Sequence, residues 1–348
     1  MDIVSFLRKP RYRNRVVHDF EIRHRRVRML SKPLLIQVES TNRCNLNCVM
    51  CARPYYDKEK NVLGDMSMET FQKIVPFIKT AELVSLFGYG EPLIAKNFWK
   101  FLEICAGLGV ATAINTNGVK LDEDTSSRLI DGGLGSLTVS LDAAREATFN
   151  AIRGYSLKKI VNNLVRFKAA KEKRHRTTPV VNINFVMMKD NLPELVEMVD
   201  LAVMIGAASL TVSNMMVYSK SLEERSVFHY MEETKLIFKE AEKKAREVDL
   251  PLMLPDFQKK VVDCVQPFEM LFINWDGKVR PCCSAAFVSD RFSLPVGDLA
   301  KEDLGTIWNN RDMARIRKGL IGKGKLAVQC ATCGFRIKDA QGHMRYIG

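Results

Sequence analysis

The sequence has no apolar run that approaches the ~18 residues of a membrane-spanning helix. It also has no signal peptide, because the apolar patch at its start is too short, turns basic at once and precedes no small-residue cleavage site. Internal repeats and low-complexity segments are absent as well. We therefore expect a cytoplasmic protein, without a membrane-spanning segment, that folds around an ordinary packed core.

A fourth cysteine is missing from the densest cysteine cluster of the chain. Cys44, Cys48 and Cys51 lie within eight residues and are spaced Cys-x3-Cys-x2-Cys. A zinc site or a cubane iron–sulfur cluster normally takes four protein ligands, so three thiolates leave one position on the metal open to a substrate or cosubstrate. Zinc sites usually repeat Cys-x2-Cys pairs, so the spacing favours iron–sulfur over zinc without excluding zinc. Nine cysteines in a reducing compartment indicate metal ligands rather than disulfides.

The bulk numbers suit one large α/β domain followed by a small one, with 348 residues of which 47% are hydrophobic. The net charge of +13 is uneven, because residues 1–33 hold ten Lys and Arg against three Asp and Glu. This basic N-terminal leader could contact nucleic acid, an anionic membrane surface, an acidic redox partner or a phosphorylated substrate. It could equally be a solvated arm that leads into the fold, since no aromatic stacking pattern accompanies the charge.

Apolar strands alternate with amphipathic helices through the middle of the chain, over residues 34–254. Strands are expected at 34–39, 83–87, 110–115, 136–141, 180–187 and 208–212. Helices are expected from an N-cap at Ser67, through 98–105, at 129–130, over 145–172, through 195–203 and over about 221–248. Six such alternations predict parallel βαβ units with right-handed crossovers, in an open or partial barrel.

Polar residues gather where the expected strands end. Cys44, Glu91, Asn117 and Asp142 all lie at or just beyond the carboxyl end of a strand, the edge where such folds build their sites. The turn Gly88-x-Gly90-Glu91-Pro92 is a weak signal alone and could be an ordinary tight turn. Beside an open-cornered cluster, its glycines would let a ligand approach and its carboxylate could hold an ammonium group. This predicts a site for an amino acid that chelates iron.

The pattern changes after about residue 255. Residues 270–279 are expected to form a hairpin around an Asp-Gly turn, and a helix is expected over 303–319. The cysteines of this region are Cys264, Cys282, Cys283, Cys330 and Cys333. Residues 255–348 are therefore expected to form a small second domain held together by metal.

The order of three motifs resembles the radical S-adenosylmethionine (SAM) superfamily over most of residues 34–215. These motifs are the three-cysteine loop after the first strand, Gly90-Glu91-Pro92 after the second, and Ser140-Leu141-Asp142 after the fourth. The resemblance implies a partial (β/α)6 TIM-like barrel. It also implies that the three cysteines hold a [4Fe–4S] cluster whose fourth iron binds the amine and carboxylate of SAM.

The resemblance also implies a set of SAM contacts. They are Met50 near the adenine, Gly88, Gly90 and Glu91 toward the amino group, Ser140 and Asp142 near the ribose or methionine, Arg153 at the carboxylate, and Asn117 on the same rim. Glu91 and Arg153 are the implied catalytic residues. Plainer interpretations remain open: Arg153 and Glu91 could be surface residues, Ser140 and Asp142 could be strand-end caps, and Cys105 is expected in the core.

The C-terminal cysteines resemble the extension called SPASM. The pattern is Cys264-x12-Gly277-x4-Cys282 followed by Cys330-x2-Cys333. The further cysteines of the full pattern are missing, so the chain resembles the shortened twitch form with one auxiliary [4Fe–4S] cluster. Four thiolates would close that cluster, which suits it to moving an electron rather than binding substrate. Cys283 is either a packed neighbour or an alternative ligand to Cys282.

The activity implied by the resemblance is reductive cleavage of SAM to a 5′-deoxyadenosyl radical, fed by a low-potential donor such as flavodoxin or ferredoxin. Only about 33 residues precede the first strand, so no N-terminal recognition domain is expected, and we predict a small polyol, sugar or nucleotide-linked substrate. The predicted outcome is a net oxidation assisted by the auxiliary cluster, with a general base that the sequence does not identify. Two alternatives stand beside it: a maturase that modifies a peptide or protein, and a non-catalytic iron–sulfur electron-transfer protein.

Overall fold

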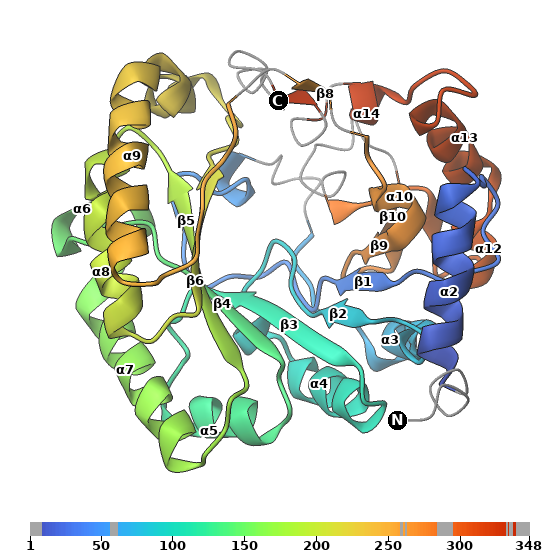
Figure 1. Cartoon of the computed structure of the whole chain (residues 1–348). Helices are drawn as coiled ribbons and strands as arrows, with labels where there is room; N and C mark the ends of the chain where they lie inside the picture. The colour runs from blue at the N-terminus through green and yellow to red at the C-terminus, as the bar shows by residue number, and fades with distance from the viewer. Residues whose placement is uncertain are drawn as a thin grey trace. The chain divides into compact units, whose positions relative to one another are not determined.

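The computed structural model describes residues 9–55, 62–257, 260–261, 263–283, 295–331, 333 and 337–338. The described residues fall into two compact units: the first contains 9–43, 62–112 and the described residues between 260 and 338, and the second contains 44–55 and 113–257. Both units combine helices with a mainly parallel sheet, which confirms the predicted α/β class (Figure 1). The domain bounds predicted from the sequence stay a prediction.

The sheet of the first unit is built around β1. Its strands are β1 (Leu35–Val38), β2 (Leu83–Ser85), β9 (Met270–Ile273), β10 (Lys278–Arg280) and β11 (Gly297–Asp298), with a separate small pair, β8 (Lys260–Val261) and β12 (Ile337–Lys338). The order is β11-β10-β9-β1-β2, and β1 pairs in parallel with both β2 and β9. A segment near the C-terminal end of the chain thus extends the sheet that begins near its start.

The predicted hairpin is confirmed in this sheet. β9 and β10 pair in antiparallel register around Asp276 and Gly277. Gly277 has a φ of 87°, a backbone conformation that residues other than glycine rarely adopt. The four residues of β9 are all buried, as expected of a strand covered on both faces.

The helices of the first unit cover this sheet. They are α2 (Pro10–Arg23), α3 (Met68–Ile78), η2 (Pro92–Ile94), α4 (Phe98–Gly107), α10 (Gln266–Glu269), α12 (Leu304–Trp308), α13 (Arg311–Leu320) and α14 (Val328–Ala331). Ser67 caps α3 as predicted, because its hydroxyl accepts from the Thr70 amide at 3.0 Å. Cys105 on α4 is fully buried, which confirms its predicted place in the core. The helix expected over 303–319 is divided into α12 and α13 by the cap Asn310.

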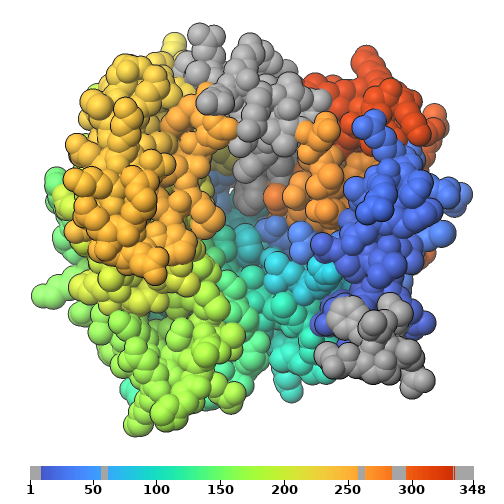
Figure 2. All heavy atoms as spheres, in the orientation of Figure 1, coloured from blue at the N-terminus to red at the C-terminus, as the bar shows by residue number. Residues whose placement is uncertain are grey.

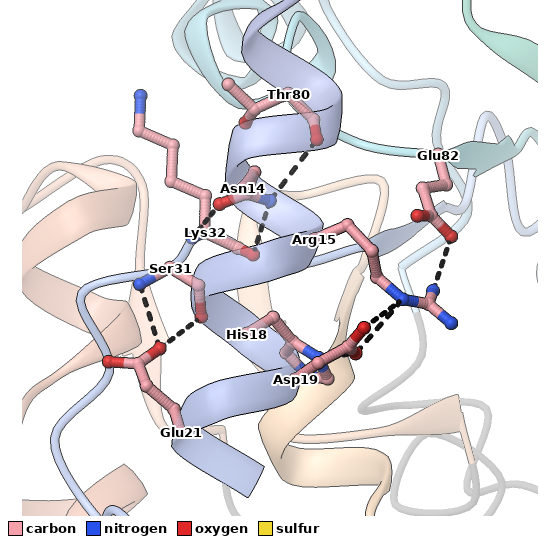
Figure 3. Close-up of polar contacts among 9 residues, drawn as sticks. All are labelled: Asn14, Arg15, His18, Asp19, Glu21, Ser31, Lys32, Thr80 and Glu82. Carbon is pink, nitrogen blue, oxygen red and sulfur yellow. Dashed lines mark hydrogen bonds and ion pairs between the residues drawn. The ribbon is translucent and has the colours of Figure 1, made fainter. Parts of the chain in front are cut away.

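The basic leader is not a solvated arm over its described residues. It forms α2, whose inner face is fastened by buried polar side chains (Figure 3). The Asn14 amide donates to the carbonyl oxygens of Lys32 at 3.0 Å and Thr80 at 3.3 Å, and accepts from the Lys32 amide at 2.7 Å. The Glu21 carboxylate accepts from the Ser31 hydroxyl at 2.6 Å and amide at 3.1 Å. These bonds hold α2 against residues 31–32, which lead into β1, and against Thr80, which follows α3.

The second unit holds five parallel strands in the order β3-β4-β5-β6-β7. They are β3 (Ala111–Thr116), where the two units meet in sequence, β4 (Ser136–Ser140), β5 (Val180–Met187), β6 (Ser209–Asn214) and β7 (Leu252–Met253). Alternate residues of β5 are buried, and its strand neighbours β4 and β6 follow the same two-residue period. The predicted strands are confirmed, and β7 is an addition.

The helices of the second unit follow most of the predicted ranges. They are η1 (Arg53–Tyr55), α5 (Glu123–Asp131), α6 (Glu146–Arg153), α7 (Leu157–Lys173), η3 (Leu192–Glu194), α8 (Leu195–Met204), η4 (Lys220–Arg225), η5 (Val227–His229) and α9 (Met231–Glu247). Gly154 divides the stretch expected over 145–172, because its φ of 67° ends α6 in the left-handed region. The helix predicted over 221–248 is wrong in its first ten residues, which form two short 3-10 turns separated by the extended Ser226.

None of the helices in the described ranges combines the length and the apolar character needed to span a membrane.

Candidate functional site

Glu39, directly after β1, fixes the approach to the cysteine loop within the first unit. One oxygen of its buried carboxylate accepts from the Tyr89 amide at 2.9 Å, and the other accepts from the Asn274 side chain and the Trp275 amide at 3.2 Å each. Burial raises the pKa of Glu39, and these three N–H groups act against that rise by stabilising the carboxylate. One side chain therefore ties the end of β1 to the glycine-rich turn and to the hairpin.

The glycine-rich turn is shaped by contact with the chain itself. A Cβ atom on Gly88 would lie 2.6 Å from the Glu39 side chain, and one on Gly90 would lie 2.3 Å from the Thr41 carbonyl oxygen and 2.4 Å from that of Arg43. Such distances leave no room for any side chain. The segment that leads into the cysteine loop therefore approaches both glycines closely, and the ligand contact expected of them from the sequence stays a prediction.

Glu91 is buried, with 2% of its surface exposed, so the interpretation as a surface carboxylate is wrong. Its amide donates to the Arg43 carbonyl oxygen at 2.8 Å, and its carboxylate caps η2 by accepting from the Leu93 amide at 3.2 Å. Pro92 then starts η2 at a position where no amide hydrogen is needed. Since Arg43 directly precedes Cys44, the Gly-Glu-Pro turn holds the first residue before the cysteine loop.

The cysteine loop opens the second unit as an irregular segment. Within it, the Cys51 amide donates to the Cys48 carbonyl oxygen at 3.1 Å, and the Cys44 sulfur accepts from the Leu46 amide at 3.5 Å. Burial raises the pKa of the Cys48 thiol to about 11, and it also raises that of Cys51. Charge repulsion from Cys51 and Cys44 adds to the shift of Cys48, and repulsion from Cys44 adds to that of Cys51, so the sulfurs of the loop lie close enough to affect one another.

Asn117 lies beside the first of these sulfurs. Its side-chain amide nitrogen is 3.7 Å from the Cys44 sulfur and 2.8 Å from the Asn45 side-chain oxygen, and its oxygen accepts from the Val119 amide at 3.0 Å. The residue follows β3, and its backbone position is set by the turn at Gly118. Asn117 is therefore oriented as an N–H donor toward a candidate cluster ligand.

Arg153 lies beside the second sulfur and is buried, which rules out the surface interpretation. Its Nε donates to the Asp142 carboxylate at 2.5 Å, its Nη2 forms an ion pair with the same carboxylate, and its Nη1 is 3.7 Å from the Cys48 sulfur. Burial by itself lowers the pKa of Arg153, but the charges of Asp142 and Cys48 outweigh it and raise that pKa. The guanidinium stays charged and spans from Asp142 to Cys48.

Asp142 is held in place by residues that the sequence patterns do not single out. Asn191, fully buried, donates to the Asp142 carbonyl oxygen at 2.7 Å, and the Val186 amide donates to the Asp142 carboxylate at 2.7 Å. The buried Glu194 accepts from the amides of Ala144 and Arg145 just downstream. The sequence signal for these residues is the pair Asn191 and Glu194 beyond the end of β5, which resembles an ordinary polar turn.

Met50 and Ser140 are the two remaining predicted SAM contacts of this unit. Met50 is buried in an apolar cluster that also contains Cys48, Ile152, Met188, Met215, Val217 and Leu222. Ser140 is half-buried and ends β4. The cluster packs under the cysteine loop and gives it an apolar support, with the Val49 amide bonded to the Ile152 carbonyl oxygen at 3.0 Å.

The C-terminal cysteines belong to the first unit. Cys264 precedes α10, Cys282 and Cys283 follow β10, Cys330 lies in α14 and Cys333 follows it, and all five are half-buried. All nine cysteines of the chain are described, and none is in a disulfide. The side chains next to the ligand candidates of this region lie partly outside the described residues.

The three-cysteine loop fits an iron–sulfur cluster by the chemistry of its donors. Among the described residues, no three His, Cys, Asp or Glu side chains are close enough to enclose a single metal ion. A cubane cluster binds each thiolate at a different iron, so its ligands stand farther apart than around one ion. N–H groups aimed at ligand sulfurs, as Asn117 and Arg153 provide here, orient the thiolates and tune a cluster's potential.

These features define an α/β protein with a three-thiol site at the carboxyl ends of its strands, and comparison with known proteins identifies its family. The profile of the radical SAM superfamily matches residues 38–202, and the profile of the SPASM iron–sulfur cluster-binding domain matches residues 264–334. The chain therefore belongs to the radical SAM superfamily and carries a C-terminal SPASM domain. It is a radical SAM enzyme: such a domain binds a [4Fe–4S] cluster and SAM, and a SPASM domain binds auxiliary iron–sulfur clusters.

Relatives match along almost the whole chain. A tungsten-containing aldehyde ferredoxin oxidoreductase cofactor-modifying protein of Pyrococcus furiosus is 25% identical over 320 residues, covering 86% of this chain and 87% of its own. A PqqA peptide cyclase of Bradyrhizobium diazoefficiens is 25% identical over 322 residues, covering 89% and 81%.

Solved structures agree on the fold. SuiB of Streptococcus suis bound to S-adenosylmethionine has a TM-score of 0.68 at 16% identity, covering 92% of this chain and 75% of that one. The native anSMEcpe structure with bound AdoMet has a TM-score of 0.63 at 17% identity, covering 88% of each chain. At these identities the likeness supports the fold alone, including the predicted partial barrel.

Proposed function

We propose that this radical SAM enzyme modifies a peptide or a protein. The observation that carries the proposal is the PqqA peptide cyclase, which this chain resembles over 89% of its length and through both of its cluster-binding regions. The prediction of a small polyol, sugar or nucleotide-linked substrate depends on the short leader and on the resemblance to a form with a single auxiliary cluster, and these relatives give it no support. A peptide substrate was the alternative considered beside it.

The residues proposed to hold the first cluster are Cys44, Cys48 and Cys51. When the cluster and SAM are bound, they would supply one-electron cleavage of SAM and a radical that takes hydrogen from an unactivated C–H bond. Asn117 and Arg153 then keep two ligand sulfurs oriented through their N–H groups. The apolar cluster around Met50 excludes water from the inner side of the loop.

We assign the SAM contacts by the same family resemblance. Glu91 is proposed to accept the amino group of SAM, and the glycines of its turn are proposed to line the same contact. Ser140 and Asp142 are proposed to line the ribose or methionine side. The Asp142 carboxylate also bonds Arg153 and the Val186 amide, which supports a second role for it in positioning Arg153.

Cys264, Cys282, Cys330 and Cys333 are proposed to hold one auxiliary cluster, with Cys283 as a packed neighbour. Replacing Cys44, Cys48 and Cys51 by alanine should then leave about four irons per chain after anaerobic reconstitution. An iron content near zero, or near that of the unchanged protein, would contradict these ligand sets. We propose the cytoplasm as the location, because nine thiols and no disulfide suit a reducing compartment.

The substrate class can be tested with the reconstituted protein, dithionite and SAM in the absence of oxygen. Formation of 5′-deoxyadenosine is expected to rise when a short peptide encoded beside this gene is added, and mass spectrometry should show a peptide that has lost hydrogen. A panel of polyols, sugars and nucleotides serves as the comparison. Stimulation by a panel member instead of the peptide would refute the peptide proposal, and no cleavage of SAM by a protein with an intact cluster would refute the assigned cluster site.

A further inference from the structure

The outward face of α2 carries apolar side chains that are exposed to solvent in the part of the chain that the structure describes. Its inner face is fastened by Asn14 and Glu21 (Figure 3), which fixes which side of the helix faces solvent. On that side, Val16 is 57% exposed, Val17 37% and Phe20 53%. Their spacing of one and four residues puts them on one stripe of the helix. Figure 2 shows blue, N-terminal atoms at the surface on the right of the face drawn.

Arginines frame this apolar stripe. Arg13 lies one turn before Val16 and Arg23 lies about one turn after Phe20, so both belong to the same side of α2, and both are exposed. Further exposed arginines follow the helix: Arg25, Arg26 and Arg28. Within the part of the chain that the structure describes, none of these five forms an ion pair. We call Val16, Val17, Phe20, Arg13 and Arg23 the outward patch.

The grouping of these exposed apolar side chains differs from the scattered exposed residues of an ordinary solvated helix surface. Single exposed apolar residues are common on proteins, but here three lie together between positive charges that form no ion pair with any described residue. Leu30, after the helix, is also 88% exposed. Arg25 has a φ of 48°, where glycine or asparagine is the usual residue and arginine is disfavoured. The chain thus keeps a positive side chain where the backbone alone would favour glycine.

We propose that the outward patch docks this enzyme onto an anionic lipid surface. An amphipathic helix with bulky apolar side chains between arginines is the form in which proteins lie at the headgroup boundary. Arginine forks bind lipid phosphates, and their long stems let apolar neighbours reach the acyl region. The patch is a convex ridge of one helix, which suits a deformable lipid surface better than the shaped surface of an acidic protein. The proposal does not depend on the substrate assigned above.

Vesicle binding by the reconstituted full-length protein tests the proposal. Vesicles of phosphatidylcholine are compared with vesicles in which about a quarter of the lipid is phosphatidylglycerol. The unchanged protein should float with the anionic vesicles and not with the neutral ones, and added salt should release it. Arg13→Gln with Arg23→Gln should weaken binding roughly twenty-five-fold, since each cation near such a surface contributes about fivefold. Val16→Ser with Phe20→Ser should weaken it about tenfold or more.

A matched control is available on α9, where Leu236 is 61% exposed and Lys239 is also exposed. Leu236→Ser with Lys239→Gln removes one apolar and one positive side chain from a different helix, and should leave vesicle binding unchanged. Iron content and the far-ultraviolet circular dichroism spectrum verify that each variant folds. If the Val16 and Phe20 variant does not fold, the arginine variant decides, because neither arginine side chain has a hydrogen bond or ion pair with any residue that the structure describes.

Three results would overturn the proposal. The unchanged protein could bind neither vesicle, or it could bind both kinds alike. The α9 control could lose as much binding as the α2 variants. Finally, an acidic redox protein such as flavodoxin could bind the unchanged enzyme and lose that binding in Arg13→Gln with Arg23→Gln, while vesicles are ignored, which would assign the outward patch to a protein partner.

Discussion

Arg153→Lys is the substitution that best separates two roles for this arginine. The guanidinium uses Nε and Nη2 on Asp142 and Nη1 on the Cys48 sulfur. A lysine keeps the positive charge but has one nitrogen, which cannot reach both groups from the end of α6. We expect the Asp142 contact to be retained in part and the contact with sulfur to be lost. The free energy of unfolding should fall by about 1–3 kcal/mol, since one charge-assisted bond disappears in a buried setting.

The lost N–H···S contact has a predictable electrochemical effect. A donor beside a ligand sulfur stabilises the reduced cluster more than the oxidised one, because the reduced cluster carries more negative charge. A differential contribution of about 1 kcal/mol corresponds to roughly 40 mV for a one-electron couple. The midpoint potential of the cluster at Cys44, Cys48 and Cys51 should therefore become more negative by a few tens of millivolts in Arg153→Lys.

The measurement is a potentiometric titration without SAM, followed by electron paramagnetic resonance, with the signal assigned by its loss in Cys48→Ala. Arg166→Lys on α7 is the control, because Arg166 is exposed and bonds only within its own helix. An unchanged potential in Arg153→Lys, together with weaker SAM binding, would refute the reasoning. That result would instead place Arg153 at the carboxylate of SAM, as the family resemblance implies.

Three further substitutions test the packing that positions the site. Gly90→Ala should lower the free energy of unfolding by about 2–3 kcal/mol, because the added Cβ would overlap backbone oxygens. The control, Gly107→Ala on α4, has open space around the added Cβ and should be neutral or slightly stabilising. Equal effects of the two substitutions would contradict this reasoning. Glu39→Gln should cost about 1–3 kcal/mol in urea unfolding, because an amide NH2 would face an N–H donor; an unchanged midpoint would contradict it. Arg317→Ala should lower the free energy of unfolding by about 3 kcal/mol or more, since the buried guanidinium donates to two backbone carbonyl oxygens and stacks on a tryptophan. Arg315→Ala, at an exposed position, should change it by less than about 0.5 kcal/mol. The reverse order of the two effects would refute this role of Arg317.

Signals that are local in the chain were readable from the sequence. The cysteine spacing, the Asp-Gly hairpin and the cap at Ser67 each depend on residues a few positions apart. The strand-end positions of Asn117 and Asp142 also followed from the apolar periodicity. What could not be read is which groups these side chains meet. Asn117 meets a sulfur 73 positions away, a distance over which spacing gives no information.

The helix α2 and the contacts of Glu39 could not be predicted from the sequence, for physical reasons. The inner face of α2 uses Asn14, His18 and Glu21 in place of apolar residues, so hydrophobic periodicity gives no helix signal there. Glu39 resembles the last residue of a buried strand, and its partners Asn274 and Trp275 lie near the other end of the chain. Buried polar bonds of long range determine both elements, and no local propensity predicts them.

The parallel pairing of β1 with β9 has a consequence for how the protein is made. β1 leaves the ribosome early, but its partner follows only after most of the chain, and the bond from Asn274 to Glu39 spans 235 positions. The first unit therefore cannot complete its sheet during most of translation, whereas every strand pair of the second unit joins neighbours in sequence. Long-range closure is slow, and an unpaired β1 edge is prone to aggregation in the meantime. A truncation that removes β9 should thus leave a protein that accumulates as aggregates while its middle segment still folds.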